Sequence, residues 1–409
     1  MPPFPLDIPH LFTSVGENLI YLVIGIGFGY ALEISGFAIS TKLANQFYFK
    51  DMTVLKVMFT AIVVAMVLVF AASGLGLLDF NLVWVPPTYL WPGIVGGLVM
   101  GVGFIVGGFC PGTSLVSLST FKIDGLFFAL GTLIGIFVFG ETVDTYAVWW
   151  NSSYFGRLTL MDWLGLGTGV VVLAVVLMAL FMFWGAEQLE RIFGGKDPKQ
   201  APRWRYAAAG ALLLGAIVVL VIGQPTTQER WTSLEPTKGA LLAERQVQIH
   251  PGELLATMSD RNLNLKMIDV RDEAEYNLFH VEDATLVPLE YIPQQVDALL
   301  AEPANTVIVL MGNDEERATE AWKTLTAESV PNVYILEGGI NNWLDTFAAQ
   351  DSQLQRISAS GADSLRYTFP AALGARYPAA TPNPEEYELE YTPKIKLDVK
   401  RGPGGGGCG

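Results

Sequence analysis

The sequence predicts a polytopic α-helical membrane domain of about six spans, followed by a soluble α/β domain and a flexible C-terminal tail. Hydrophobic residues make up 51% of the 409 residues and charged residues only 16%. The mean hydropathy of +0.38 is too high for an ordinary soluble protein of this length. Residues 1–223 hold 12 acidic and 10 basic residues, whereas residues 224–409 hold 28 and 15. A nearly neutral membrane part therefore precedes an acidic soluble part.

Six apolar segments are long enough to cross a bilayer, whose hydrocarbon core of about 30 Å needs roughly 20 helical residues. They run near residues 18–37, 54–78, 89–109, 125–139 or slightly beyond, 163–184 and 207–222. The first ten residues contain no Lys or Arg, so the first segment is expected to be a retained span and not a cleaved signal peptide.

The basic residues of the connecting segments fall mainly on one side of the expected membrane. Nine of them share that side: Lys42, Lys50, Lys56, Lys122, Arg191, Lys196, Lys199, Arg203 and Arg205. The other side has only Arg157. Because Lys and Arg are retained in the cytoplasm, the N-terminus and everything after Ile222 are expected outside. In a bacterium this means a multi-pass protein of the inner membrane whose C-terminal domain is periplasmic.

The membrane part contains an internal repeat at an offset of 72 residues, with copies at 18–90 and 91–150. The repeated positions of the first copy are Gly25, Gly29, Gly36, Phe37, Thr41, Leu43, Phe49 and Lys50. Their counterparts are Gly97, Gly101, Gly108, Phe109, Thr113, Leu115, Phe121 and Lys122. Interrupted helices at matching places in two repeats point to a transport site. The alternative is that the glycines serve only to pack the helices.

The break in the second copy carries a cysteine, in the run Gly107-Gly108-Phe109-Cys110-Pro111-Gly112-Thr113-Ser114. Proline favours the first position of a helix, so Pro111 places Cys110 at the N-cap. Free backbone N–H groups and the positive end of the helix dipole bind anions there and favour a thiolate. Together with Thr113 and Ser114, this site suits a small sulfur oxyanion. The alternative is a buried structural cysteine.

This segment and its repeat resemble the YeeE/YedE sulfur-transport family, whose repeats carry Gly-Phe-Cys motifs at helix breaks. The resemblance covers roughly residues 18–150 and implies uptake of thiosulfate or a related sulfur species, with Cys110, Pro111, Gly112, Thr113 and Ser114 on the path. One departure is that Ala38 stands in the first copy where the second has Cys110. A relay through several cysteines is therefore not expected here.

Glu33 lies at the edge of the first span. An ionisable group at that depth is a functional candidate. Lys42 and Lys122 are the expected ion-pair partners, so a structural role is the favoured interpretation.

A polar linker at residues 224–245 is expected to lead into a soluble domain at residues 246–348. Strand-like runs at 267–270, 307–310 and 333–336 alternate with helix-like stretches such as 315–327, which predicts a parallel sheet. Two motifs in this domain resemble the opening and closing signatures of a single rhodanese domain. They are Asp269-Val270-Arg271 with Glu275, Tyr276 and His280, and Glu337-Gly338-Gly339-Ile340 with Trp343.

The resemblance implies a loop after the central strand that should hold a nucleophilic cysteine. The loop reads Met311-Gly312-Asn313-Asp314-Glu315-Glu316-Arg317. Counting forward from the strand puts Met311 at the nucleophile position, and counting back from Arg317 puts Gly312 there. Neither residue can form a persulfide, and three acidic side chains would repel an anionic donor. The domain is therefore expected to have no catalytic residue of its own.

The C-terminal part is expected to consist of an extension at residues 349–401 and a glycine-rich tail at residues 402–409. The extension ends in an alternating segment, residues 394–400. The tail carries Cys408 after four glycines, and a tail of eight residues reaches at most about 26 Å. It resembles the swinging arm of the carrier subunit of the Sox thiosulfate-oxidising system, which implies that Cys408 carries sulfur. The alternative is a disordered end with an incidental cysteine.

The leading hypothesis is membrane transport of a small sulfur compound coupled to a periplasmic sulfur-binding module. The alternatives are a membrane-anchored sulfur carrier or sulfurtransferase component, and a non-catalytic subunit of a membrane complex. Expected partners are the sulfur compound, membrane lipid, periplasmic proteins of sulfur metabolism and a second copy of the chain. The acidity argues against nucleic acid. The histidines His10, His250 and His280 are scattered, so neither a metal nor another cofactor is expected.

Overall fold

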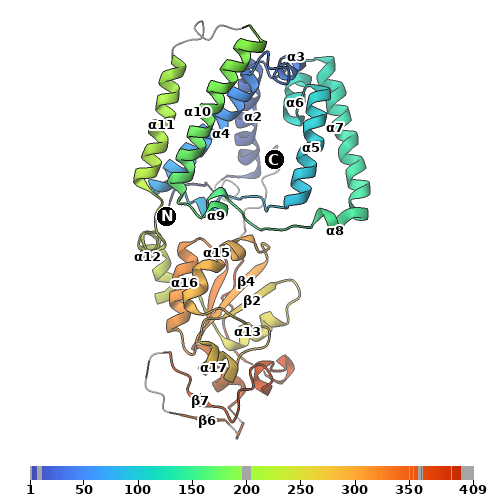
Figure 1. Ribbon diagram of the computed structural model, residues 1–409. Helices are drawn as coiled ribbons and strands as arrows, with labels where there is room; N and C mark the ends of the chain where they lie inside the picture. Colours follow the sequence, from blue (N-terminus) through green and yellow to red (C-terminus); the bar gives the residue numbers. More distant parts are fainter. Residues whose placement is uncertain are drawn as a thin grey trace. The chain divides into compact units, whose positions relative to one another are not determined.

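The computed structural model describes residues 2–6, 12–195, 204–349, 351–352, 354–357, 361, 363–387 and 389–397. It contains two compact units that divide between Gln224 and Pro225 (Figure 1). Each unit has its own hydrophobic clusters, which confirms the predicted combination of a helical membrane part and a soluble part.

Six helical segments of the first unit are long and apolar enough to span a membrane. Their main helices are α2 (Ser14–Ile34), α4 (Thr53–Gly74), α5 (Leu90–Gly107), α7 (Ile123–Thr142), α10 (Thr168–Phe193) and α11 (Trp204–Ile222). Shorter helices lie between them: α3 (Ser40–Ala44), α6 (Pro111–Ser119), α8 (Ala147–Trp150) and α9 (Leu160–Leu164). All six predicted spans are thus present.

The fifth span differs most from its predicted bounds of 163–184. Two glycines, Gly165 and Gly167, separate α9 from α10, so the long helix begins at Thr168. It then continues to Phe193 through charged residues whose side chains find partners. Glu190 forms an ion pair with Lys56 at 2.6 Å, and Glu187 forms one with Arg205 at 2.6 Å. An unpaired charge is costly to bury, and for this reason the predicted span ends before the first charge. Because these charges are paired, the helix can continue past them.

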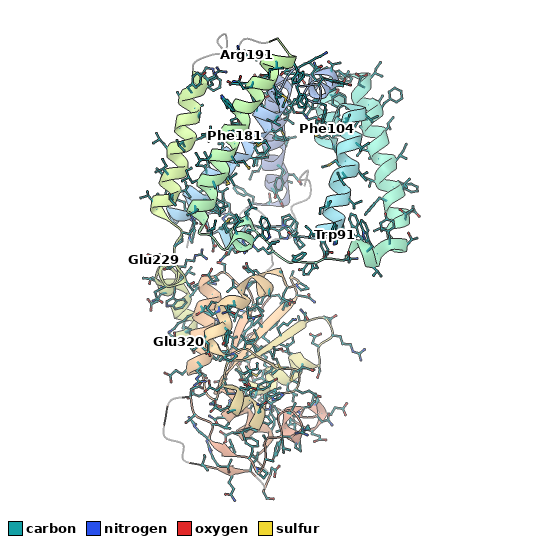
Figure 2. The ribbon with its side chains drawn as sticks, in the orientation of Figure 1. Trp91, Phe104, Phe181, Arg191, Glu229 and Glu320 are labelled. Atoms are coloured by element: carbon teal, nitrogen blue, oxygen red, sulfur yellow. The ribbon has the colours of Figure 1, made fainter. Side chains whose placement is uncertain are left out.

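The helices of the first unit pack in two groups (Figure 1). In one group, α4, α10 and α11 enclose a cluster that includes Val63, Val67, Val172, Val176, Ala216 and Val219. In the other, α6 packs against α7, and α2 and α3 contact α6 and α5 respectively. Many apolar side chains remain on the outside, such as Trp91 and Phe181, which are 58% and 68% exposed (Figure 2). A surface of this kind suits hydrocarbon better than water.

The second unit is built on a five-stranded, fully parallel sheet in the order β1-β5-β4-β2-β3. Its strands are β1 (Gln248–Ile249), β2 (Asn264–Asp269), β3 (Thr285–Leu286), β4 (Thr306–Met311) and β5 (Val333–Leu336). The helices around it are α13 (Pro251–Met258), α14 (Glu273–Leu278), α15 (Ile292–Ala301), α16 (Glu316–Ala327) and α17 (Gly339–Phe347). Strand β4 is buried along its whole length, as expected for the centre of a parallel sheet.

The segment at residues 224–245, expected to be a polar linker, contains a helix. Helix α12 (Thr227–Ala243) starts at a capping box in which Thr226 and Glu229 bond each other's backbone N–H groups. Trp231 then packs edge-on against Trp322 of α16, with ring centroids 5.9 Å apart. A polar sequence of this length would not form a stable helix alone, and an apolar tertiary contact of this kind stabilises it.

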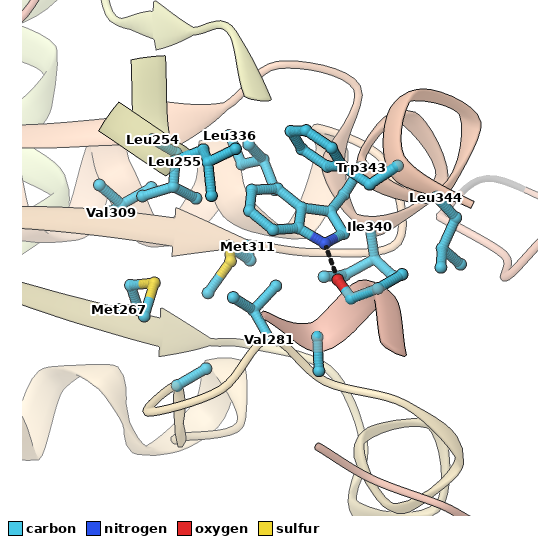
Figure 3. Close-up of a cluster of buried hydrophobic side chains, with 14 of the residues drawn as sticks. Leu254, Leu255, Met267, Val281, Val309, Met311, Leu336, Ile340, Trp343 and Leu344 are labelled. Carbon is cyan, nitrogen blue, oxygen red and sulfur yellow. Dashed lines mark hydrogen bonds between the residues drawn. The ribbon is translucent and has the colours of Figure 1, made fainter. Parts of the chain in front are cut away.

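The extension after α17 also belongs to the packed unit. Two short strands, β6 (Gln355–Arg356) and β7 (Tyr367–Thr368), pair antiparallel. Tyr377, Ala379 and Ala380 then enter the core, where Trp343 Nε1 donates to the carbonyl of Ala379 at 2.7 Å (Figure 3). Short 3₁₀ helices among the described residues lie at Phe80–Leu82, Val143–Tyr146, Leu289–Tyr291, Pro378–Ala380 and Pro384–Glu386.

The alternating segment 394–400 does not form a strand over its described residues, 394–397. Side chains of other segments hold its backbone, in place of hydrogen bonds to a neighbouring strand. The carboxylate of Glu253 accepts hydrogen bonds from the backbone N–H groups of Lys394 and Ile395 at 2.7 and 2.8 Å. The hydroxyl of Tyr334 bonds both backbone groups of Lys396. The alternation therefore reflects attachment to the domain and not sheet formation.

Candidate functional site

The break between α5 and α6 has the local geometry that the sequence predicts. Helix α5 ends at Gly107, and Gly108 adopts the left-handed conformation with φ of +70°, which only glycine enters readily. Pro111 is the first residue of α6, and Cys110 is its N-cap. The cysteine thus lies at the helix start, where unpaired N–H groups converge.

The thiol of Cys110 is hydrogen-bonded within a reciprocal cap. Its Sγ accepts from the backbone N–H of Thr113 at 3.4 Å. The Thr113 hydroxyl lies 3.3 Å from this sulfur and 3.2 Å from the carbonyl oxygen of Cys110, and its single hydrogen serves one of these two acceptors. The same hydroxyl accepts from the N–H of Cys110 at 2.9 Å. Ser114 instead donates to the carbonyl of Pro111 at 2.7 Å. Both the N–H and the hydroxyl of Thr113 therefore lie at the sulfur of Cys110. Cys110 is half-buried, and Thr113 and Ser114 are buried.

The break of the first copy shares the left-handed glycine but has different side chains. Gly36 is left-handed with φ of +79°. Ala38, at the position that corresponds to Cys110, is fully buried. Lys42, at the position that corresponds to Ser114, extends its ammonium group 2.8 Å from the carbonyl of Ser35, close to the end of α2. A cation is stabilised at this negative end of a helix.

The two breaks touch each other. Phe37 and Phe109 are each 1% exposed and belong to one cluster with Leu43 and Val54. A Cβ atom at Gly108 would lie 3.1 Å from both the Cβ and the carbonyl oxygen of Ser40, so only glycine allows this approach. The two copies that the sequence repeat defines are thus in contact at their breaks.

Glu33 joins the two copies by an ion pair. Its Oε1 lies 3.8 Å from Nζ of Lys122, whereas Lys42, the other candidate partner, bonds the backbone of Ser35. A second link runs from the hydroxyl of Ser40 to Oδ2 of Asp124 at 3.1 Å. Both links cross from the first copy to the second, which fits the favoured structural role of Glu33.

Sequence reasoning missed Ser117, which follows Ser114 by three residues on α6. Its side chain is fully buried, and its Oγ has no hydrogen-bond partner among the described residues. A Cβ atom at Gly125 would lie 2.6 Å from this oxygen, so α6 and α7 approach closely at this point. The helical spacing of Thr113, Ser114 and Ser117 was the available signal.

In the second unit, the opening motif, Asp269-Val270-Arg271, contacts the loop after β4. Arg271 and Asp269 are both fully buried and form an ion pair at 2.6 Å. Arg271 also donates to Oδ1 of Asn313 at 3.2 Å and to the carbonyl of Phe279 at 2.7 Å. Such a charge pair is stable in the interior only because its remaining donors are used. The motif therefore holds the loop in place.

The structure separates the two positions at which a nucleophile was expected. Met311 is the last residue of β4, and its side chain lies in the core near Leu336, Ile340 and Trp343 (Figure 3). Gly312 is the first residue of the loop, and its carbonyl accepts from the N–H of Ile340 at 2.9 Å. Of the two, Gly312 is thus the residue that a nucleophile in the loop would replace.

The charged residues around the loop are paired. Glu315 accepts from Arg245 at 2.7 Å and from the N–H of Gly338 at 2.7 Å. Arg317 forms ion pairs with Asp272 at 3.2 Å and with Asp363 at 3.3 Å. Because Arg245 and the N–H of Gly338 compensate for the charge of Glu315, the repulsion expected from the acidic run is reduced.

His280 has a structural position. Its ring stacks on Tyr276, with centroids 3.7 Å apart, and its Nδ1 lies 2.8 Å from the Tyr276 carbonyl. Within the described parts of the chain, no three His, Cys, Asp or Glu side chains gather where they could hold a metal ion. His10 and Cys408 both lie outside the described residues.

Comparison with known families decides the affiliation of the chain. Residues 35–246 match the family described as Sulphur transport. The chain belongs to this sulphur transport family. Residues 250–346 match the rhodanese-like domain. Searches of curated proteins and of solved structures found no match.

In this member of the sulphur transport family, the matched segment contains both helix breaks and continues through α12. The rhodanese-like match contains the loop at Gly312 and ends in α17. The extension from residue 349 onward follows that match. Each unit therefore contains one of the two candidate regions, the paired breaks in the first and the loop at Gly312 in the second.

Proposed function

We propose that the membrane unit transports a small sulfur compound, thiosulfate or a related species, through the paired helix breaks. Membership of the sulphur transport family supports sulfur as the cargo. The observation that carries the proposal is the contact between two broken helices 72 residues apart, one of which has Cys110 at a helix start. Discontinuous helices at matching places are the usual binding element of transporters.

Cys110 contacts the cargo in this proposal. An oxyanion at the start of α6 gains from the helix dipole and from the N–H groups of the first turn. The thiol can donate to an anionic oxygen or lie against the terminal sulfur, since both sulfurs are polarizable. Lys42 adds positive charge at the contacting break. Passage then requires no covalent step.

The soluble unit serves this transport as a periplasmic module. Positive residues favour the cytoplasmic side, and their distribution in the loops supports a location of the N-terminus and the soluble unit outside the inner membrane. The rhodanese-like fold acts as a scaffold or docking surface, because Gly312 provides no thiol. Cys408 on its glycine-rich tail carries the sulfur to or from partner proteins.

Uptake of labelled thiosulfate by proteoliposomes tests the transport proposal. We expect the purified protein to support uptake and Cys110→Ala to reduce the initial rate at least about tenfold, the effect of 1.4 kcal/mol on a barrier. Cys110→Ser, which keeps a small polar group, should retain part of the activity. Ser119→Ala is the matched control, because Ser119 is an exposed residue of α6 that bonds only its own helix.

The outcomes of this experiment separate the alternatives. Unchanged uptake by Cys110→Ala would remove Cys110 from the path. No uptake by the unmodified protein would reject transport of thiosulfate and favour a membrane-anchored carrier. Thermal unfolding of each variant in detergent shows whether a loss of uptake reflects misfolding.

Intact-mass analysis tests the carrier role of Cys408. After incubation with a persulfide donor, we expect added sulfur on the unmodified protein and on Cys110→Ala, and none on Cys408→Ala. A thiol at residue 408 that stays unmodified would contradict the carrier role. Labelling of Cys408 by an impermeant maleimide in intact spheroplasts tests the periplasmic orientation, and labelling only after lysis would reverse it.

A further inference from the structure

The loop after β4 is occupied by a carboxylate from the extension of the same chain. A Cβ atom at Gly312 would lie 2.9 Å from Oδ1 and 3.3 Å from Oδ2 of Asp363. The Asp363 carboxylate thus takes the space that a side chain at residue 312 would need. Asp363 follows Gly312 by 51 residues in the sequence and lies beyond the rhodanese-like match, which ends at residue 346.

This carboxylate makes the contacts of a bound anion. Its Oδ1 accepts from the backbone N–H of Asp314 at 2.7 Å. Its Oδ2 forms an ion pair with Nε of Arg317 at 3.3 Å and accepts no hydrogen bond among the described residues. The side chain of Asp363 is only 4% exposed. A carboxylate is buried to this degree only where donors and an opposite charge compensate for lost water.

The backbone around Asp363 is tied to the same loop. The N–H of Asp363 donates to Oδ2 of Asp314 at 2.9 Å, and its carbonyl accepts from Nδ2 of Asn313 at 2.7 Å. Asn313 is itself held by Arg271 at 3.2 Å. The loop and the extension are therefore joined by reciprocal bonds, and the carboxylate is placed by several independent contacts.

The loop offers an anion site for general physical reasons. It turns directly into α16, a helix of 12 residues, so backbone N–H groups and the positive end of the helix dipole lie near Arg317. The charge of Glu315 is compensated by donors of its own, whereas Oδ2 of Asp314 faces Asp363 and accepts from its N–H at 2.9 Å. Glu315 is bound by Arg245 and by Gly338 N–H, and Oδ1 of Asp314 accepts from the N–H of Glu316 at 2.9 Å.

We propose that Asp363 is a built-in carboxylate ligand of the rhodanese-like loop, which closes it to soluble anions, and that removing this carboxylate opens a binding site for a small sulfur oxyanion. The donors left free would be the N–H of Asp314 and Nε of Arg317, whose two terminal nitrogens stay bonded to Asp272. The space left beside Gly312 would accept the anion. This inference concerns the soluble unit and does not depend on the proposed transport.

Hydrogen exchange of the full-length protein in detergent, read by mass spectrometry, tests the proposal at the loop itself. In Asp363→Ala without added anion, we expect the amides of residues 312–317 to exchange roughly ten times faster, because a hydrogen bond to a charged acceptor is lost. Thiosulfate, titrated at constant ionic strength with chloride, should restore their protection. In the unmodified protein, thiosulfate should leave the exchange of these amides unchanged.

Three further variants make the result specific. Asp363→Ala combined with Arg317→Gln should lose the response to thiosulfate. Asp363→Asn, which keeps the shape but not the charge, should give an intermediate response and decides the case if Asp363→Ala does not fold. Asp345→Asn is the matched control, because Asp345 binds Arg356 and Tyr367 of the extension away from the loop. It should not create a thiosulfate response.

Two results would overturn the proposal. If thiosulfate does not restore protection in either Asp363 variant, the loop is not an anion site. If thiosulfate protects the unmodified protein to the same extent, Asp363 does not close the loop. Sulfate in place of thiosulfate distinguishes a general oxyanion site from one that requires the terminal sulfur.

Discussion

The break at Cys110 and the loop at Gly312 use the same physical device and differ in what fills it. Each is a sharp turn that leads directly into a helix, α6 in one case and α16 in the other. At the membrane break, the thiol of Cys110 is the N-cap and remains half-buried. At the soluble loop, glycine replaces a side chain and the Asp363 carboxylate occupies the space.

This difference indicates how a helix start can be open or closed to a ligand. An N-terminal turn favours negative charge whatever its source. In the second unit, the charge comes from the chain itself and is held by several bonds. Beside Cys110, the hydrogen-bonding groups are the hydroxyl and the backbone N–H of Thr113 in its own helix, and no acidic side chain is among them. The first turn is therefore able to take a charge from outside.

The comparison assumes that the loop of the rhodanese-like domain is held in a defined structure. Arg271→Ala tests this, because it leaves the fully buried charge of Asp269 without its partner. We expect the opening free energy of β4 to fall by about 3–5 kcal/mol, measured by native-state hydrogen exchange. Arg356→Ala, which removes an exposed ion pair, should cost less than about 1 kcal/mol. Equal effects would contradict a supporting role for Arg271.

The contact between the two breaks can be tested at Gly108. Alanine at this position must adopt φ of +70° and approach Ser40 at 3.1 Å, so we expect a loss of about 1–3 kcal/mol. Gly101→Ala is the control, because a Cβ atom there meets nothing within 4 Å. Thermal unfolding in detergent should rank the two variants clearly. Similar stabilities would show that the breaks do not depend on their contact.

The attachment of Asp363 to the soluble loop should depend on pH, which is a further difference from the break at Cys110. Burial, together with the nearby Asp314 carboxylate, raises the pKa of Asp363 to about 6. Burial also raises the pKa of Asp314, but hydrogen bonds from the N–H groups of Glu316 and Asp363 outweigh it and lower that pKa overall. In the folded state, Asp363 therefore keeps its proton up to a higher pH than it does in the unfolded chain.

The sign of the effect follows from the raised pKa. A group that binds its proton more tightly when folded stabilises the fold below its unfolded pKa of about 3.9 and loses that contribution as pH rises through about 6. Attachment of the extension should thus weaken between pH 4 and pH 7 by about 1–2 kcal/mol, as measured by the opening of residues 363–368. Asp363→Asn should remove this change. Other charged groups near the pair are Arg317, Asp272, Glu275 and Arg366.

The smallest effect is expected at Glu33. Its ion pair with Lys122 is 3.8 Å long and partly exposed, so Glu33→Gln should change stability by less than about 1 kcal/mol. The initial rate of thiosulfate uptake should stay within about twofold of the unmodified protein, a difference of roughly 0.4 kcal/mol. A much larger loss of uptake with unchanged stability would make Glu33 a transport residue and link it to Cys110.

Several features were predictable because they depend on local chemistry. Long apolar runs predicted the six spans, and Pro111 predicted the helix start and the cap at Cys110. Matching residues 72 apart predicted two equivalent breaks. Gly36 and Gly108 adopt the same left-handed conformation, as do Phe49 and Phe121.

Other features could not be read from the sequence because they arise from contacts between distant segments. The capping box of α12 was visible, but a polar helix of this length needs tertiary contacts, such as the packing of Trp231 on Trp322 and the bonds of Thr227 and Arg230 to Glu328. The choice between Met311 and Gly312 required knowing which side chain faces the core. The position of Asp363 depends on a contact across 51 residues, which no local pattern records.

Substrate protection of Cys110 tests the central claim most directly. Cys110 and Cys408 are the two cysteines of the chain, so Cys408→Ala leaves Cys110 as the single thiol, and intact mass reports its modification by N-ethylmaleimide. We predict that thiosulfate, compared with chloride at equal ionic strength, slows this modification in proteoliposomes. The same rate of modification with and without thiosulfate, in a variant that still takes thiosulfate up, would contradict a path through Cys110.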